Sequence, residues 1–152
     1  MNHPNDLEAH LGYWLRKLSN QVSGAFAARV EKFGISIAGW VVLRVLFDHE
    51  SLPLKDIVSQ VGVDQGALSR MVERLMVRGL VARTQSPTSR REVAISLTEE
   101  GRKLVPKLAR EADENDRAFF NHLPVRRRAE LLSMVKTLLS LNKSDSPDRP
   151  IN

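Results

Sequence analysis

Arginines are concentrated in one short segment of this 152-residue chain. Between Gln65 and Arg91 there are six arginines and a single acid, Glu73, so the net charge of this segment equals the +5 of the whole chain. The six are Arg70, Arg74, Arg78, Arg83, Arg90 and Arg91. A planar guanidinium makes forked contacts with phosphates and with the edge of guanine. The clustering therefore predicts a nucleic-acid-binding surface.

The residues that follow Asp64 are the candidates for contacting DNA bases. In a helix-turn-helix, the second helix lies in the major groove and its N-terminal, outward residues reach the base edges. Gln65 can bond adenine and Arg70 can bond guanine, whereas Arg74 and Arg78 are predicted to meet phosphates. The predicted DNA-contacting residues of this helix are Gln65, Gly66, Ser69, Arg70 and Arg74, among which Gly66 allows close approach.

A second pair of arginines, Arg90 and Arg91, follows the polar stretch Ser86-Pro87-Thr88-Ser89. Arginines at the tip of a hairpin can enter a narrow, electronegative minor groove, with Arg91 the preferred residue here. The alternative is a set of solvated surface arginines, which is the commoner fate of any single arginine. Six arginines in one segment favour the DNA-binding interpretation.

These residues need a scaffold, and the apolar pattern predicts a mainly helical one. Apolar residues step by threes and fours from Leu7 to Val30, which predicts a long helix that stops near Gly34. A second helix is predicted from the N-cap Ser36 to about His49.

A helix-turn-helix is predicted next. Pro53 suits the first position of a short helix that Gly62 ends, and Asp64 suits the N-cap of the following helix, with Gly79 just past its end. The inner face of this following helix is predicted to hold Leu68, Met71 or Val72, Leu75 and Met76.

The periodicity then changes from helical to alternating. Leu80 and Val81 lead one short strand, and a polar loop over 84–92 separates it from a second strand. The second strand alternates Val93, Ile95 and Leu97 with Ala94 and Ser96. A hairpin placed directly after the second helix of a helix-turn-helix is the wing of a winged helix.

Two further helices are predicted after the hairpin. Thr98 can cap the first of them, whose apolar stripe runs through Leu104, Leu108, Ala112 and Phe119 or Phe120. Pro124 fits the first turn of the last helix, which carries Leu131, Val135 and Leu138. The charge runs Glu111-to-Asp116 and Arg126-to-Arg128 are interpreted as solvated helix faces, or alternatively as groups that face one another within or across a dimer.

The predicted fold class is mainly α with a small β-hairpin wing. We assign 35–97 to a winged helix-turn-helix DNA-binding region, 1–34 with 98–143 to a helical dimerisation region, and 144–152 to a flexible tail. The long helices outside the winged helix carry more apolar stripe than a small monomer can cover. We therefore predict a homodimer, which also matches a two-fold operator.

Four motifs follow one another in a characteristic order: Val63-Asp64-Gln65-Gly66-Ala67-Leu68-Ser69-Arg70, then Arg78-Gly79-Leu80-Val81, Ser89-Arg90-Arg91 and Leu97-Thr98-Glu99-Glu100-Gly101. With this recognition helix coupled to a wing, the chain resembles the MarR family of transcriptional regulators over roughly Leu7 to Leu141. The resemblance implies a homodimer, held by the first and last helices, that binds a pseudopalindromic operator in double-stranded DNA. It favours a ligand-responsive repressor.

The chain departs from the family at one position of the wing. The family usually carries an acid two residues before the arginine that matches Arg91, where it helps to brace the wing, and this chain has Ser89. We expect Arg90 and Arg91 to be less restrained as a result.

The resemblance also implies a small aromatic or phenolic effector, bound where the dimerisation helices meet the winged helix and lowering DNA affinity. Tyr13, Trp14, Arg16 and Trp40 could line such a site, because they offer aromatic walls and a cation for a carboxylate. For Trp40, simple core packing is the preferred interpretation.

Composition excludes several other functions. The chain has no cysteine, which excludes disulfides, thiolate metal sites and thiol-based peroxide sensing. We find no glycine-rich phosphate loop and no compact cluster of histidines and acids, so we predict no enzyme, no cofactor and no metal. With no apolar run long enough for a bilayer and no signal peptide, we expect a cytoplasmic protein without a membrane partner. The alternative function is a winged-helix protein-interaction module without specific DNA binding.

Overall fold

The computed structural model describes Pro4 and residues 6–142; the tail assigned to 144–152 lies outside these residues. The elements are a short 3-10 helix η1 (Leu7–Ala9), the helices α1 (Leu11–Glu31), α2 (Ile37–Phe47), α3 (Leu54–Val61), α4 (Gln65–Val77), α5 (Glu99–Phe120) and α6 (Val125–Leu141), and the strands β1 (Leu52–Pro53), β2 (Val81–Gln85) and β3 (Val93–Leu97). The three strands form an antiparallel sheet in the order β1-β3-β2. The predicted fold class, mainly α with a hairpin wing, is confirmed.

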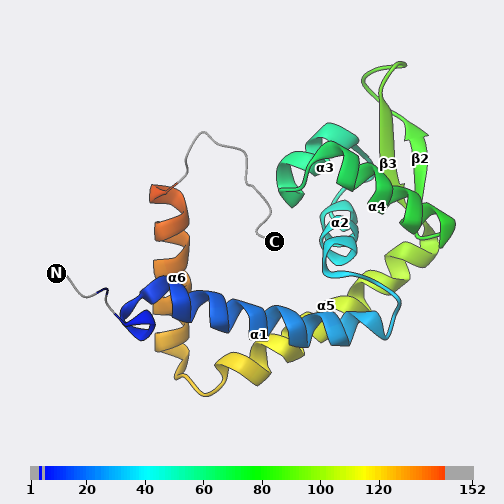
Figure 1. Cartoon of the computed structure of the whole chain (residues 1–152). Coiled ribbons are helices and arrows are strands. Elements are labelled where there is room, and N and C mark those ends of the chain that lie inside the picture. Colours follow the sequence, from blue (N-terminus) through cyan, green and yellow to red (C-terminus); the bar gives the residue numbers. More distant parts are fainter. Residues whose placement is uncertain (1–3, 5, 143–152) are drawn as a thin grey trace.

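The long helices α1 and α5 pack against each other and form a bar (Figure 1). The winged helix, made of α2, α3, α4 and the sheet, stands on one end of this bar, with the β2–β3 hairpin pointing away from it. Helix α6 lies at the other end and crosses the bar. The winged helix and α6 are thus at opposite ends of the bar.

Three predicted N-caps are confirmed. Ser36 accepts a hydrogen bond from the backbone N–H of Gly39 at 3.0 Å, and Asp64 accepts one from Ala67 at 2.9 Å. Thr98 accepts one from Gly101 at 3.1 Å. Each such bond satisfies an amide that has no partner within its helix, which stabilises the helix start by about 1 kcal/mol.

The first long helix begins later than predicted. His10 has an extended backbone (φ −96°, ψ 117°) and forms the N-cap of α1, so Leu7 falls in the separate turn η1. Helix α1 then ends at Glu31, and Gly34 lies in the turn that follows, in the left-handed conformation (φ 68°). The apolar spacing continues across His10 although the backbone hydrogen bonding of the helix does not.

Pro53 was predicted to be the first residue of a helix, but the helix begins one residue later. Pro53 itself belongs to a short strand that the sequence did not predict. Pro53 has an extended backbone (ψ 147°) and pairs with Ala94, while Leu52 pairs with Ile95. Helix α3 starts at Leu54. Proline is tolerated in a strand at the edge of a sheet, because its missing N–H can face away from the neighbouring strand.

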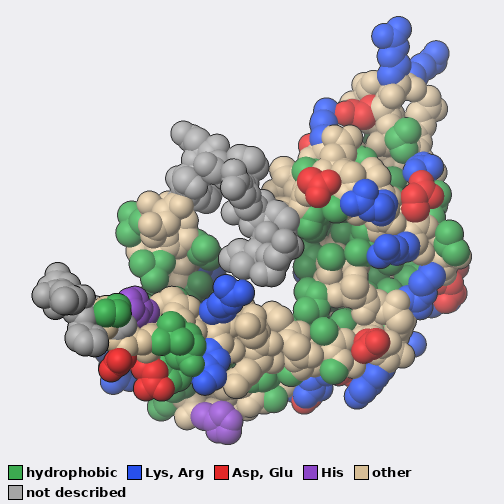
Figure 2. Space-filling model, in the orientation of Figure 1, with side chains coloured by type: hydrophobic (Ala, Val, Ile, Leu, Met, Phe, Trp, Pro, Cys, Tyr) green, Lys and Arg blue, Asp and Glu red, His purple; other side chains and the backbone are tan. Residues whose placement is uncertain are grey.

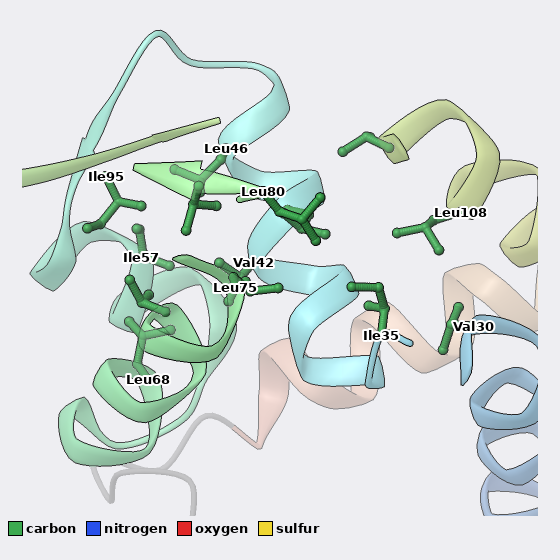
Figure 3. Close-up of a cluster of buried hydrophobic side chains, with 14 residues drawn as sticks. Val30, Ile35, Val42, Leu46, Ile57, Leu68, Leu75, Leu80, Ile95 and Leu108 are labelled. Carbon is green, nitrogen blue, oxygen red and sulfur yellow. The ribbon is translucent and has the colours of Figure 1, made fainter. Parts of the chain in front are cut away.

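The hydrophobic core lies inside the winged helix and at its junction with α1 and α5 (Figure 3). Leu68, Val72 and Leu75 supply the buried face of α4, so Val72 rather than Met71 occupies the innermost position. In β3 the predicted alternation is wrong at its start, because Val93 is 50% exposed whereas Ala94 and Ile95 are both buried. Val93 pairs with Gln85 at the end of the ladder nearest the hairpin loop.

The winged helix is joined to α5 by a close approach at Gly101. A Cβ at Gly101 would overlap the carbonyl oxygen of Leu80, so only glycine fits here. The hydroxyl of Thr98 donates to the carbonyl of Gly79 at 2.6 Å, and the N–H of Thr98 donates to that of Leu80 at 3.1 Å. The Leu-Thr-x-x-Gly motif is therefore the device that docks the start of α5 on the end of α4.

At the outer end of the bar, in contrast to the winged helix, many apolar residues are exposed. Helix α6 packs only sparsely on the other described elements and buries no residue. Its side chains and those of η1 and the first turns of α1 include many exposed apolar ones: Leu7, Leu11, Trp14, Leu15, Leu18, Leu132, Met134, Val135, Leu138, Leu139 and Leu141. We call these residues the exposed apolar face.

No ion pair joins the two charge runs among the described residues, although Asp116 and Arg128 line the same hollow between α5 and α6. Glu114 pairs with Arg117 on its own helix at 2.5 Å, and Arg126 pairs with Glu130 at 3.0 Å. Glu111 instead pairs with Arg29 at 3.2 Å and links α5 to α1.

Within residues 6–142, no helix has the length and apolar character needed to cross a bilayer.

Candidate nucleic-acid interface

The start of α4 is exposed at the face of the winged helix that lies away from the core. Gln65, Gly66, Arg70 and Arg74 are all exposed. The guanidinium of Arg70 lies beside Gly66, because a Cβ on Gly66 would be 3.6 Å from Nη1 of Arg70, an ordinary contact distance. The geometry lets the backbone at Gly66 and the guanidinium approach a groove together.

Ser69 is less exposed than the other predicted DNA-contacting residues of α4. It is half-buried and lines a cavity of about 270 Å³ between α4 and the sheet, together with Arg83 and Val93. Its position next to Leu68, whose side chain is fully buried, turns it toward the sheet. Ser69 is thus at the edge of the exposed face of α4.

The six arginines of the basic segment divide into two groups. Arg83 pairs with Glu73, which ties β2 to α4. Arg78, predicted to meet a phosphate, instead donates to the backbone carbonyls of Phe33 and Gly34. The side chains of the other four form neither an ion pair nor a hydrogen bond with any described residue, and we call them the free arginines: Arg70, Arg74, Arg90 and Arg91.

The free arginines occupy two places on one side of the molecule. Figure 2 shows basic side chains projecting from the tip of the hairpin and others on α4 below it. The one acid within the basic segment, Glu73, is engaged by Arg83 and does not neutralise them. Cations held on a protruding hairpin and on a neighbouring helix suit a polyanionic duplex, whose grooves and backbones they would meet separately.

The wing tip is braced by its own backbone at the position where the family's acid is missing. The Oγ of Ser89 accepts a hydrogen bond from the N–H of Arg91 at 3.4 Å, and its carbonyl accepts one from Glu92 at 3.3 Å. The side-chain amide of Gln85 donates to the carbonyl of Arg90 at 3.2 Å. Ser89 thus holds the backbone of the loop but offers no charge to the two guanidinium groups.

The loop end of the wing is tied to α3 by an ion pair. Lys55 Nζ lies 2.6 Å from Glu92 Oε1. The hydrogen bond to Glu92 and the negative charge of that carboxylate raise the pKa of Lys55 above its usual value of 10.5. Lys55 is exposed, and its side chain extends across the hairpin rather than outward with the free arginines.

The four candidate effector residues are not together within one chain. Tyr13 and Trp14 pack edge to face near the start of α1, with Lys17 over both rings, and Trp14 donates to the carbonyl of Glu8 at 2.8 Å. Trp40 packs edge to face on Phe26 at the border of the core, in line with the interpretation preferred from the sequence.

Phe26 lies about 18 Å along α1 from Trp14, given the 1.5 Å rise per residue of an α-helix. A site that used all four residues would therefore have to be completed by a second copy of the chain. Arg16 is exposed on α1 beside the aromatic pair.

One cavity was not predicted from the sequence. A hollow of about 290 Å³ lies between the end of α5 and α6 and is mainly apolar, with Phe120, Leu131 and Val135 among its lining residues. Arg128 also lines it, and the buried Nε of this residue has no hydrogen-bond partner among the described residues. The helical periodicity gives no signal for this hollow, because its two walls come from consecutive helices whose angle the sequence does not specify.

Comparison with known proteins gives consistent matches. Residues 35–93 match the MarR family model. The chain is 33% identical over 101 residues to the organic hydroperoxide resistance transcriptional regulator of Bacillus subtilis, a match that covers 66% of this chain and 69% of that protein.

Solved structures match over nearly the whole chain. BpsR of Bordetella bronchiseptica, whose DNA binding is described as regulated by 6-hydroxynicotinic acid, superposes with a TM-score of 0.80 at 28% identity, covering 94% of this chain and 100% of that one. CouR bound to a 23-mer DNA duplex superposes with a TM-score of 0.81 at 27% identity, covering 91% and 98%. CouR from Rhodococcus jostii bound to p-coumaroyl-CoA gives 0.81 at 25% identity, covering 95% and 100%.

Proposed function

This chain belongs to the MarR family of DNA-binding transcriptional regulators, and we propose that it acts as a repressor that binds a pseudopalindromic operator as a homodimer. The observation that carries the proposal is the pair of places occupied by the free arginines, α4 and the wing tip, with no acid of the described chain paired to them. A winged helix uses these two elements to contact the major groove and the neighbouring minor groove.

The homodimer is supported by the exposed apolar face. Leu139 is 66% exposed and Leu11 is 68% exposed, on helices at the end of the bar remote from the winged helix. An apolar surface of this extent is uncommon on a monomer and marks an interaction site. A second copy related by a two-fold axis would cover it and would present the two α4 helices to successive major grooves.

Within the interface we propose distinct roles for the residues of α4. Gln65, Ser69 and Arg70 would contact base edges, with Gly66 permitting the approach, while Arg74 would contact a phosphate. On the wing, Arg91 would enter the minor groove and Arg90 would lie beside it.

We propose that the effector is a small aromatic or phenolic compound. Two structural relatives are described with 6-hydroxynicotinic acid and with p-coumaroyl-CoA, both of which carry an aromatic ring. Tyr13, Trp14 and Arg16 offer two rings and a cation near the start of α1, and Trp40 would join them only across the dimer. The effector would lower DNA affinity by favouring a different spacing of the two α4 helices.

The similarity to a hydroperoxide regulator does not extend to thiol chemistry. Sensing of peroxides by cysteine requires a thiolate that becomes oxidised, and this chain contains no cysteine. We propose a regulator that responds by reversible ligand binding, without catalytic activity or a cofactor. The Bacillus subtilis relative is a transcriptional regulator, and we propose that this chain likewise acts on DNA in the cytoplasm.

The first experiment is selection of bound fragments from genomic DNA, followed by gel-shift titration of the selected site. We expect a two-fold symmetric site bound by a dimer. Weaker binding by Arg70→Ala and Arg91→Ala supports the proposal. If both variants bind every selected fragment as tightly as the unmodified chain and instead lose a protein contact, the winged helix is a protein-interaction module.

The division of roles on α4 is tested by titration at several salt concentrations. Arg70→Ala should relax the base preference at one position, costing about 1–3 kcal/mol of discrimination. Arg74→Ala should weaken all sequences alike and lower the slope of log K against log salt by about 0.9 for each phosphate that the variant no longer neutralises. Arg110→Ala is the matched control, because Arg110 is an exposed arginine on α5, outside the basic segment. Equal effects of all three substitutions would contradict the assigned roles.

A further inference from the structure

Arg78 connects the recognition helix to a dimerisation helix. It follows the last turn of α4, and its side chain reaches back to the turn that ends α1. Nη2 donates to the carbonyl of Phe33 at 2.8 Å, and Nη1 donates to the carbonyl of Gly34. The two nitrogens belong to one guanidinium, so a single planar group bridges the two elements.

The end of α1 suits such a group. The carbonyls of Phe33 and Gly34 lie in the turn just past α1, and the C-terminal end of a helix carries partial negative charge, so a cation placed there is stabilised. Gly34 is left-handed, with φ of 68°, and a Cβ on it would lie 3.1 Å from Nη1 of Arg78. The turn therefore has both the acceptors and the space for a guanidinium, and no acid among the described residues pairs with Arg78.

A second arginine makes a similar bridge elsewhere and provides a comparison. Arg102 on α5 donates to the carbonyls of Phe47 at 3.2 Å and His49 at 3.3 Å, at and just beyond the end of α2. This bridge joins α5 to α2 and does not involve α4. Among the side-chain hydrogen bonds of residues 6–142, those of Arg78 join α4 to the turn after α1, and Ser36 Oγ at the start of α2 also donates to Sδ of Met71 on α4 at 3.7 Å.

We propose that Arg78 is a positioning residue, which fixes the recognition helix against the end of α1 and does not bind a phosphate. The inference rests on the proposed function, because its consequence is for DNA binding by a dimer. Two recognition helices must fit successive major grooves about 34 Å apart. A helix that is loose on its frame must be ordered at each half-site, and that ordering weakens binding.

Substitution of Arg78 distinguishes positioning from phosphate contact. Lysine keeps the charge and is a good phosphate ligand, but it lacks the fork that reaches two carbonyls at once. We expect Arg78→Lys and Arg78→Ala to weaken binding of the selected full site about tenfold, a typical coupling effect, with the salt slope unchanged. A duplex that carries one half-site should show a smaller decrease in affinity, since no spacing is required of it.

Two controls define the outcomes. Arg74→Ala should lower the salt slope, as removal of a phosphate ligand does. Arg102→Ala removes an equivalent bridge that does not hold α4, and it should leave DNA affinity unchanged. If Arg78→Lys binds like the unmodified chain and Arg78→Ala lowers the slope as Arg74→Ala does, Arg78 is a phosphate ligand and the proposal is wrong.

A second measurement needs no DNA and separates this proposal from the proposed function. The chain has no cysteine, so spin labels can be attached at Gln21→Cys on α1 and at Val77→Cys on α4, where Val77 is 87% exposed. Dilution with unlabelled chain leaves only distances within one chain. We expect Arg78→Ala to broaden the distance distribution and Arg102→Ala to leave it unchanged.

An equal width in both variants would overturn the positioning role, even if the protein binds DNA. A protein that binds no genomic fragment would overturn the proposed function, and the label distances would still decide whether Arg78 fixes α4. Gly34→Ala disturbs the same contact from the side of α1, because its Cβ would displace the guanidinium of Arg78. It should broaden the label-distance distribution as Arg78→Ala does.

Discussion

The winged helix and the outer end of the α1–α5 bar use apolar residues in opposite ways. In the winged helix, Leu43, Ile57 and Leu68 are fully buried by neighbours within the same chain. At the outer end, Leu138 and Leu139 are 50% and 66% exposed. The apolar side chains of the first region are buried within one chain, whereas those of the second would be buried only by another surface.

This difference predicts whether a substitution affects folding or association. A substitution in the winged helix should lower the free energy of unfolding directly. A substitution on the exposed apolar face should act on association, because little of that face is packed within one chain.

The largest effect is expected for Leu68→Ala. Leu68 is fully buried in α4, and removal of a buried leucine side chain lowers the free energy of unfolding by about 2–5 kcal/mol. Denaturant unfolding monitored by circular dichroism measures the change. Val77→Ala on the same helix is the control and should change stability by about 0.5 kcal/mol or less, because Val77 is exposed. Similar destabilisation of the two variants would remove the contrast between a packed and an exposed face of α4.

The next effect is expected for Leu138→Glu on α6. A carboxylate placed in an apolar interface is desolvated without a partner, so we expect dimerisation to weaken about 100-fold, the size of a strong interface residue. Sedimentation at micromolar concentration should then find monomers. Val77→Glu provides the control, since the same substitution at an exposed valine of α4 should leave the dimer intact. A Leu138→Glu chain that remains dimeric would place the interface elsewhere.

The smallest effect is expected at the junction of the two regions. Thr98→Ala removes the N-cap of α5 and the hydrogen bond to the carbonyl of Gly79, so the free energy of unfolding should fall by about 1 kcal/mol. Thr98→Ser retains a hydroxyl and should recover most of this decrease. Thermal unfolding of the two variants measures the difference, and equal destabilisation by alanine and serine would assign the effect to the methyl group.

Local signals predict local features well. Ser36, Asp64 and Thr98 are recognisable as N-caps because a cap depends on residues within four positions of it. The short strand β1 gives no such signal, because its partner, β3, lies about 40 residues further along the chain and two residues are too few for a periodic pattern. His10 likewise interrupts a helix whose apolar spacing is continuous.

For the arginines, composition predicts the function of the segment, whereas packing decides the partner of each side chain. Their density between Gln65 and Arg91 is sufficient to predict a nucleic-acid-binding surface. It does not reveal that Arg83 is held by Glu73, or that Arg78 serves the end of α1. Both partnerships join elements that are separate in the sequence.

The amino-acid sequence by itself determined the order of the elements, the helix caps and the location of excess positive charge, since each depends on neighbours along the chain. The tertiary structure decided which arginines remain unpaired and which leucines remain uncovered. The physical reason is that a guanidinium or an apolar side chain is satisfied by whichever group the fold brings beside it. Phe33 and Gly34 meet Arg78 across more than 40 residues of chain.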